Sequence, residues 1–121
     1  MRLLFTGCVI KEITPLRVPN VSRVIFECRE GVVEAEFHKE VMGEITVGAQ
    51  TELSITESKE ECLEYYFCGQ GYVVSNNKVG EKYRVIISLH GFLVVVKTDH
   101  QLPLNSMNKV YFACNIQTLH K

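Results

Sequence analysis

The chain has 121 residues, of which 46% are hydrophobic and 22% are charged, and its formal net charge is −1. This composition is typical of one globular domain, residues 1–121, and excludes intrinsic disorder. A near-neutral chain also differs from a dedicated duplex-binding domain, because neutralising phosphates usually requires a strongly basic surface.

The predicted elements follow from an alternation of apolar and polar residues, which is the period of half-buried antiparallel strands. In chain order, it predicts strands over residues 23–28, 33–38, 52–56, 83–90 and 110–117. Residues 39–43 and 57–63 are the only helical candidates. In the second of these, Ser58 is a potential N-cap with Glu61 three residues later, so the sequence predicts at most one or two helical turns.

Turn-forming residues separate these runs. Glu30 and Gly31 predict a hairpin, residues 76–80 predict a turn, and His90 with Gly91 joins two strongly apolar runs. Residues 69–71 predict a bend or bulge within a strand. About eight short, closely spaced strands predict an all-β fold, either a closed antiparallel barrel or a sandwich. We favour a single closed barrel, because an open sheet of this length would expose edges that need covering or pairing.

The start of the chain is too short and too polar for a signal peptide, and its longest apolar stretch, residues 92–96, is far shorter than a membrane span. We therefore expect a soluble, intracellular protein with no membrane partner. The five cysteines are odd in number and none has CxxC spacing, so we expect core or inert thiols rather than a zinc site.

The charge is unevenly distributed along the chain. Residues 27–64 contain eleven glutamates and three lysines or arginines, a net charge of −8, whereas the segments before and after carry +3 and +4. Either these charges solvate strand faces and loops, or an acidic and a basic face meet different surroundings.

No catalytic constellation is visible. Asp99 is the only aspartate, most glutamates occupy the polar phase of strands, and no phosphate-binding glycine motif occurs. We expect His38 and His90 to be exposed strand or turn residues rather than ligands. The sequence therefore predicts no catalytic residue, no metal site and no cofactor.

Aromatic residues cluster between residues 65 and 72, with Tyr83 beyond them. Interleaved with Lys78, Lys82 and Arg84, they could form a stacking platform for single-stranded nucleic acid. The alternative is that they divide between the core and the outer surface of a small barrel, because neighbouring strand residues face opposite ways.

The hairpin over residues 84–97 is apolar on both faces. One set of alternating residues is apolar: Val85, Ile87, Val94 and Val96. The residues that would face the other side of the sheet include Ile86, Leu93 and Val95, which are apolar too. A barrel strand with one buried face does not need this pattern, so either another part of the chain covers the hairpin or it docks on a partner. Little chain is left over, which favours the partner.

Three segments resemble the eighth-subunit family of eukaryotic-type RNA polymerases, whose archaeal member is called the G subunit. Residues 21–24 fit the family's V-S-R-[LV], residues 66–72 fit Y-x-x-G-x-x-Y, and residues 88–93 fit S-x-G-G-L-L. In the third segment His90 replaces the first glycine and Phe92 the first leucine. The closing strand at residues 110–112 matches V-Y-L, and the resemblance covers about residues 5–117.

The resemblance implies a barrel of the oligonucleotide-binding type and a non-catalytic subunit seated on the outside of the largest polymerase subunit. It also implies the archaeal short form, since the acidic insertion of eukaryotic members is reduced here to residues 57–64, and hence a cytoplasmic location. The docking residues that it suggests are Tyr66, Tyr72, Ser88, Leu89, His90, Gly91, Phe92 and Leu93. Leu89, Phe92 and Leu93 would be the apolar anchors.

A different class of function stays open from the sequence. The same barrel could act alone as a binder of single-stranded nucleic acid, and a polymerase subunit could itself contact such a strand weakly. The aromatic cluster and the basic C-terminal half favour this alternative, whereas the near-neutral charge and the acidic residues 27–64 argue against it.

Overall fold

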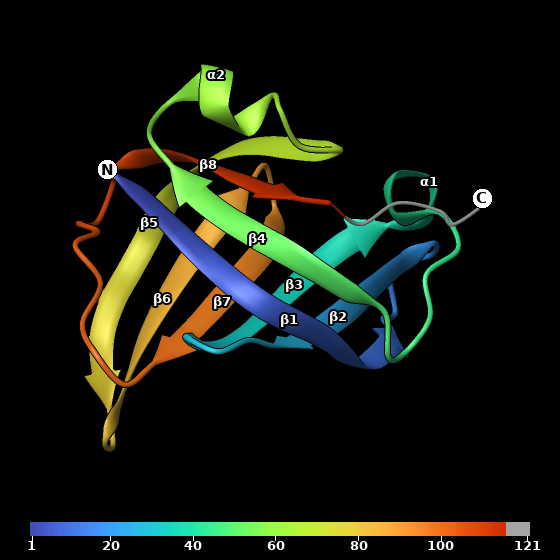
Figure 1. Cartoon of the computed structure of the whole chain (residues 1–121), viewed down its shortest axis with the longest axis horizontal. Helices are drawn as coiled ribbons and strands as arrows, with labels where there is room; N and C mark the ends of the chain where they lie inside the picture. Colours follow the sequence, from blue (N-terminus) through green and yellow to red (C-terminus); the bar gives the residue numbers. More distant parts are fainter. Residues whose placement is uncertain (116–121) are drawn as a thin grey trace.

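In the computed structural model, which describes residues 1–115, eight strands close into an antiparallel barrel with two short helices outside it (Figure 1). Around the barrel the strands follow the order β1-β2-β3-β7-β6-β5-β8-β4. The bounds of the elements are β1 Arg2–Pro15, β2 Val21–Glu27, β3 Gly31–His38, α1 Lys39–Met42, β4 Gln50–Thr56, α2 Lys59–Cys62, β5 Phe67–Val79, β6 Lys82–Leu89, β7 Phe92–Thr98 and β8 Lys109–Cys114. The predicted closed barrel with little helix is confirmed, and the two final residues of the last predicted strand, Ile116 and Gln117, lie outside the described residues.

Strand β1 closes the barrel, although the alternation of the sequence does not predict it. Its first half pairs with β4 and its second half with β2, and the register shifts between Phe5 and Cys8 and again between Ile10 and Glu12. Each shift moves the buried positions out of a period of two. One long, twice-irregular strand thus joins the two ends of the sheet.

The core lies inside the barrel and consists of the inward residues of every strand. Phe5, Phe26 and Phe112 are its largest fully buried side chains, and Phe37 meets Phe67 edge to face with ring centroids 5.3 Å apart. Strands β2, β3, β6 and β7 alternate buried and less buried residues as predicted. Burial of this apolar set is the main favourable term that holds the strands together.

The two helical turns occur where the sequence predicts them. Ser58 caps α2 by accepting a hydrogen bond from the Glu61 backbone N–H at 3.2 Å, and His38 caps α1 through its Nδ1, which accepts from the Glu40 N–H at 3.1 Å. Helix α2 packs on the outer side of β4, β8 and β5, where Figure 1 shows it above the barrel. Under it Cys62 and Tyr65 form a second, smaller apolar cluster with Ala113 of β8.

Two local predictions are wrong. Residues 76–80 do not form the turn, because β5 continues through Asn76 to Val79 and the chain reverses only at Gly80. The Asn76 amide donates hydrogen bonds to the carbonyls of Leu102 and Leu104, so it is held by the loop before β8. Residues 69–71 pair regularly with β8, and the irregularity of β5 lies between Val73 and Ser75.

The glycines of residues 69–71 allow β5 and β6 to approach each other closely and do not form a bulge. A Cβ at Gly71 would lie 2.2 Å from the Ser88 carbonyl oxygen of β6 and 2.6 Å from Leu89 Cδ2. Such distances leave no space for any side chain, so glycine lets β5 cross the end of β6.

The expectation of unlinked thiols is wrong for four of the five cysteines. Disulfides join Cys8 of β1 to Cys28, which follows β2, and Cys62 of α2 to Cys68 of β5. Cys114 is buried and takes no part in either bond. The spacing of cysteines along the chain does not reveal these pairs, because each depends on which elements the fold places side by side.

Candidate docking face

Both faces of the β6–β7 hairpin are apolar in the structure, as the sequence indicates. Val85, Ile87, Val94 and Val96 point into the barrel and have no exposed surface. The residues between them point outward. Packing in the core therefore explains why one face of the hairpin is apolar, but not why the other is.

The outward apolar residues of the hairpin continue onto β5. Leu93 pairs with Ser88, which pairs with Tyr72, and Val95 pairs with Ile86 one row further along. Together with Val74 these side chains form what we call the docking face: Tyr72, Val74, Ile86, Leu93 and Val95. The side chains of Tyr72, Val74 and Leu93 are 44%, 51% and 39% exposed, so a large part of this surface remains in contact with water.

A second apolar region on the outside of the barrel, on β8, is covered by the chain itself. On β8, Tyr111 and Ala113 also point out of the barrel, yet they are 7% and 0% exposed because α2 and Tyr65 cover them. Across residues 1–115, the outside of the barrel thus has one apolar region covered by its own chain and another that is left open. An apolar surface of this kind, rimmed by polar groups, is typical of a protein-interaction site.

One edge of the docking face is held by a carboxylate. Glu36 of β3 accepts a hydrogen bond from the Leu93 backbone N–H at 2.9 Å, and its other oxygen lies 3.8 Å from Arg23 Nη2. This bond fixes the start of β7 beyond the last ladder pair with β3. Sequence reasoning does not find Glu36 and Val74, since only the pairing of the strands brings them to the hairpin.

The residues suggested by the resemblance divide into three groups. Tyr72, Ser88 and Leu93 lie together in one row across β5, β6 and β7. His90 and Gly91 form the turn between β6 and β7, both with positive φ, and Gly91 N–H donates to Ser88 Oγ at 3.3 Å.

The third group lies away from the outer face. Leu89 is only 6% exposed and belongs to the core, so little of its surface is available as an anchor to a partner. Phe92 is partly buried and packs against the same core. Tyr66, 55% exposed, precedes β5, and its N–H donates to Asn115 Oδ1. Of the three expected anchors, Leu93 alone points outward from the sheet with a largely accessible side chain.

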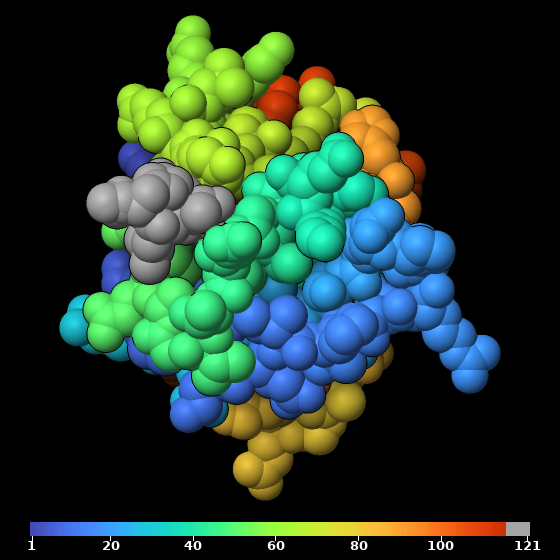
Figure 2. All heavy atoms as spheres, turned by 90° about the vertical axis from the view of Figure 1, so that its right-hand side faces the viewer, coloured from blue at the N-terminus to red at the C-terminus, as the bar shows by residue number. Residues whose placement is uncertain are grey.

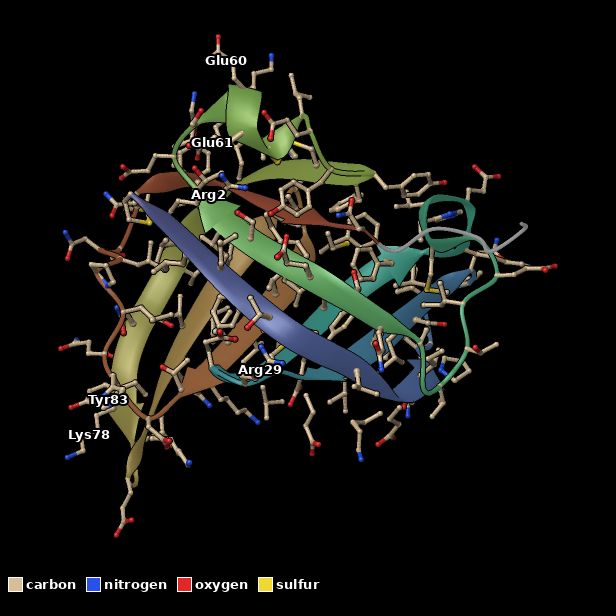
Figure 3. The ribbon with its side chains drawn as sticks, viewed as in Figure 1. Arg2, Arg29, Glu60, Glu61, Lys78 and Tyr83 are labelled. Carbon is tan, nitrogen blue, oxygen red and sulfur yellow. A yellow bond between two sulfur atoms is a disulfide. The ribbon has the colours of Figure 1, made fainter. Side chains whose placement is uncertain are left out.

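The aromatic residues do not form a stacking platform. Tyr65 is buried under α2 and Phe67 packs against the core, whereas Tyr66 and Tyr72 are exposed. Tyr83 lies near the tip of the β5–β6 hairpin with Lys78 near its ring (Figure 3), at the other end of the β5–β6 ladder from Tyr72. The aromatic side chains therefore divide between the core and the surface, as the alternative interpretation expects.

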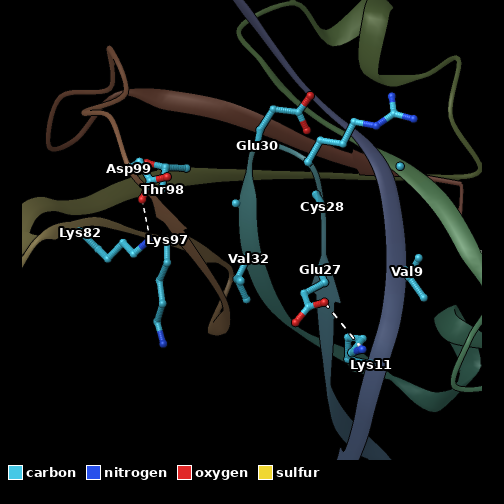
Figure 4. Close-up of a pocket in the computed structure, with 13 residues that line it drawn as sticks. Val9, Lys11, Glu27, Cys28, Glu30, Val32, Lys82, Lys97, Thr98 and Asp99 are labelled. Atoms are coloured by element: carbon cyan, nitrogen blue, oxygen red, sulfur yellow. Dashed lines mark hydrogen bonds and ion pairs between the residues drawn. The ribbon is translucent and has the colours of Figure 1, made fainter.

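An open cavity of about 660 Å³ lies at the end of the barrel where β1, β3 and β7 meet. It is lined by both signs of charge (Figure 4). Lys82 is bonded to Asp99, and Lys11 lies 3.7 Å from Glu27. Lys97 is also paired, with Glu34, and Arg29 lies next to Glu30 in the chain. Because carboxylates accompany the cations throughout the lining, the cavity does not concentrate positive potential for a phosphate backbone.

Within residues 1–115 there is no group of three or more histidine, cysteine or acidic side chains placed to hold a metal ion. No helix among those residues is long and apolar enough to cross a membrane.

Comparison with known proteins identifies the family. Residues 3–117 match the family model that describes the G subunit of DNA-directed RNA polymerase. The chain belongs to this family. It is also 29% identical over 122 residues to DNA-directed RNA polymerase subunit Rpo8 of Saccharolobus solfataricus, and the match covers 90% of this chain and 89% of the relative.

Membership of this family confirms the resemblance and makes the chain a non-catalytic subunit of an archaeal-type DNA-directed RNA polymerase. Its partner is accordingly the polymerase complex. A stand-alone binder of single-stranded nucleic acid is not favoured.

Proposed function

We propose that the chain is a structural and assembly subunit, one domain of residues 1–121, that seats on the outside of the largest polymerase subunit through the docking face. The observation that carries the proposal is an apolar outer surface on β5, β6 and β7 whose side chains stay exposed in the isolated chain. Association would remove this surface from water, and Leu93 and Tyr72 would be its central contacts.

The neighbouring groups suit a protein partner. Ser88 supplies a hydroxyl in the same row, and the turn of His90 and Gly91 lies at the end of the face, with the partly buried Phe92 after it. An apolar centre with a polar rim is the usual anatomy of a protein–protein interface. Phosphate contacts would instead demand unpaired cations, and Lys97 beside the face is bonded to Glu34 at 3.1 Å.

Leu93→Asp tests the proposal directly. A charge at the centre of a desolvated interface should weaken association with the largest polymerase subunit by at least tenfold, or about 1.4 kcal/mol. Leu4→Asp is the matched control, because Leu4 is also an outward strand leucine, 42% exposed, but lies on β1 across the barrel from β6.

Binding would be measured by interferometry on the purified largest subunit, with circular dichroism melts to confirm that both variants fold. If Leu93→Asp folds and binds as tightly as Leu4→Asp, this face is not where the subunit docks. Tyr72→Ala provides a second variant that adds no charge, and we expect it to weaken association as well.

We also propose that the barrel is of the oligonucleotide-binding type and that the subunit resides in the cytoplasm with its polymerase. Disulfides are rare in most cytosolic proteins, but intracellular proteins of hyperthermophilic archaea are a known exception. A weak contact with single-stranded nucleic acid remains part of the proposal, and a salt titration of oligonucleotide binding by the assembled polymerase with and without this subunit tests it.

A further inference from the structure

Next to the docking face the barrel has an apolar groove that nothing in the described chain fills. It encloses about 230 Å³ and is lined by Phe37, Val41, Phe67, Leu89 and Phe92, with Glu36, His38, Gln70 and His90 at its rim and Gly69 in one wall. Figure 2 looks onto this end of the barrel, where the orange β6–β7 turn lies beside the teal segment around α1.

We propose that this groove is an anchor pocket that receives one large, uncharged apolar side chain from the polymerase subunit on which the chain docks. The inference rests on the proposed function and adds a specific contact to it. It gives α1 and the start of β5 a role in binding, whereas the docking face includes no residue of either.

The size and lining of the groove define the occupant. Sites for drug-sized ligands usually measure about 300–1,000 Å³, so this smaller groove suits a single side chain better than a free cofactor. Three phenylalanines, a leucine and a valine provide most of its surface, and aromatic walls favour an aliphatic or aromatic occupant. A side chain of this kind, buried in a pocket, is the usual form of an interface hot spot.

The polar groups at the rim indicate that the occupant is uncharged. The Glu36 carboxylate is already engaged by the Leu93 N–H and by Arg23. His38 Nδ1 accepts from the Glu40 N–H as the cap of α1. Neither group needs a counter-charge from the partner, and a charged side chain inserted among the phenyl rings would lose its hydration without compensation.

Continuity with the docking face indicates that the occupant comes from the same polypeptide partner. Phe92 lines the groove, and the next residue, Leu93, lies on the docking face. Glu36 links the two, since it lines the groove and accepts a hydrogen bond from the Leu93 backbone N–H. Leu93 faces outward and Phe92 faces the groove, so a protein seated on Leu93 and Tyr72 reaches the groove by extending around the β6–β7 turn.

Val41→Trp tests the inference by filling the groove from its own wall. Val41 is 37% exposed on α1, so an indole there blocks the groove while leaving the core packing unchanged. Val47→Trp is the matched control, because Val47 is an exposed valine in the following loop that does not line the groove. We expect Val41→Trp to weaken binding to the largest polymerase subunit about tenfold and Val47→Trp to change it less than twofold.

Comparison with Leu93→Asp separates this inference from the proposed function. If Leu93→Asp abolishes binding but Val41→Trp and Val41→Glu both bind as wild type, the docking face stands and the anchor pocket is overturned. If wild-type protein does not bind the largest subunit, both are overturned.

A photoreactive amino acid at position 41 identifies the occupant in the assembled polymerase. Cross-links to a leucine, isoleucine, methionine or phenylalanine of the largest subunit support the pocket. Cross-links to a charged residue, to nucleic acid or to this chain itself would contradict it.

Discussion

Reduction of the two disulfides should remove much of the stability of the barrel. Cys8–Cys28 spans a sequence separation of 20 residues and Cys62–Cys68 a separation of 6. In the chain-entropy treatment, closing loops of these lengths stabilises the folded state by about 3.3 and 2.2 kcal/mol at 25 °C. The loops do not overlap, so their effects add, and small domains have a total stability of only about 5–15 kcal/mol.

The assay combines thiol counting with unfolding. In denaturant, the oxidised chain should show one thiol, from Cys114, and the reduced chain all five. Urea unfolding of the two forms should then give free energies that differ by several kcal/mol. Five thiols before reduction, or equal unfolding midpoints for the two forms, would refute the reasoning.

Paired variants examine the dependence on loop length. In each disulfide one cysteine is fully buried and the other partly buried, so replacing both by alanine removes similar packing from each pair. The double variant C8A/C28A should therefore be less stable than C62A/C68A by about 1 kcal/mol, the entropy difference between the two loop lengths. Equal stabilities would indicate that unfolded-state entropy is not the main effect.

Two further predictions concern the strand crossing and the edge of β1. Gly71→Ala should destabilise the fold by about 3 kcal/mol, because β5 and β6 must separate to make room for the new methyl group. Gly80 has open space around it, so Gly80→Ala should cost only about 1 kcal/mol, for its positive φ. Urea unfolding of the two variants measures this difference. Burial acts to raise the pKa of Glu30, but hydrogen bonds from the Thr6 N–H and hydroxyl outweigh it and hold that pKa below the usual 4.5. The stability from this contact is therefore present above pH 4.5 and lost as the pH falls through the lowered pKa. Thr6→Val should raise the pKa of Glu30 in an NMR titration, and an unchanged value would contradict this assignment.

The parts of the fold that follow a strict period can be predicted from the sequence, and the parts that depend on pairing cannot. Val94 and Val96 alternate with Val95 along an unbroken strand, so both faces of the hairpin are evident from the sequence alone. In β1 the two register shifts around Cys8 interrupt the same pattern and hide the strand. The Cys8–Cys28 bond is hidden for a related reason, because the neighbours of β1 are set by the whole barrel.

The candidate site shows the same limit. The segment of residues 88–93 is located by its motif, but a motif does not tell which residues face the solvent. Leu89 and Leu93 are separated by one turn, yet the first points into the barrel and the second out of it. The groove beside them cannot be predicted at all, since it exists only where α1, β3 and β5 meet the hairpin.

The two apolar regions on the outside of the barrel explain how a small chain can be both a stable fold and an assembly subunit. Where α2 covers β8, the apolar residues stabilise the isolated chain, and a disulfide holds the helix in place. On β6 and β7, which no other part of the described chain covers, the same kind of residue adds little to folding and exposes surface to water. That exposure is unfavourable in the free chain, and the association through this face that we propose would relieve it. Under that proposal the distribution of apolar residues favours the assembled polymerase over the separate subunit.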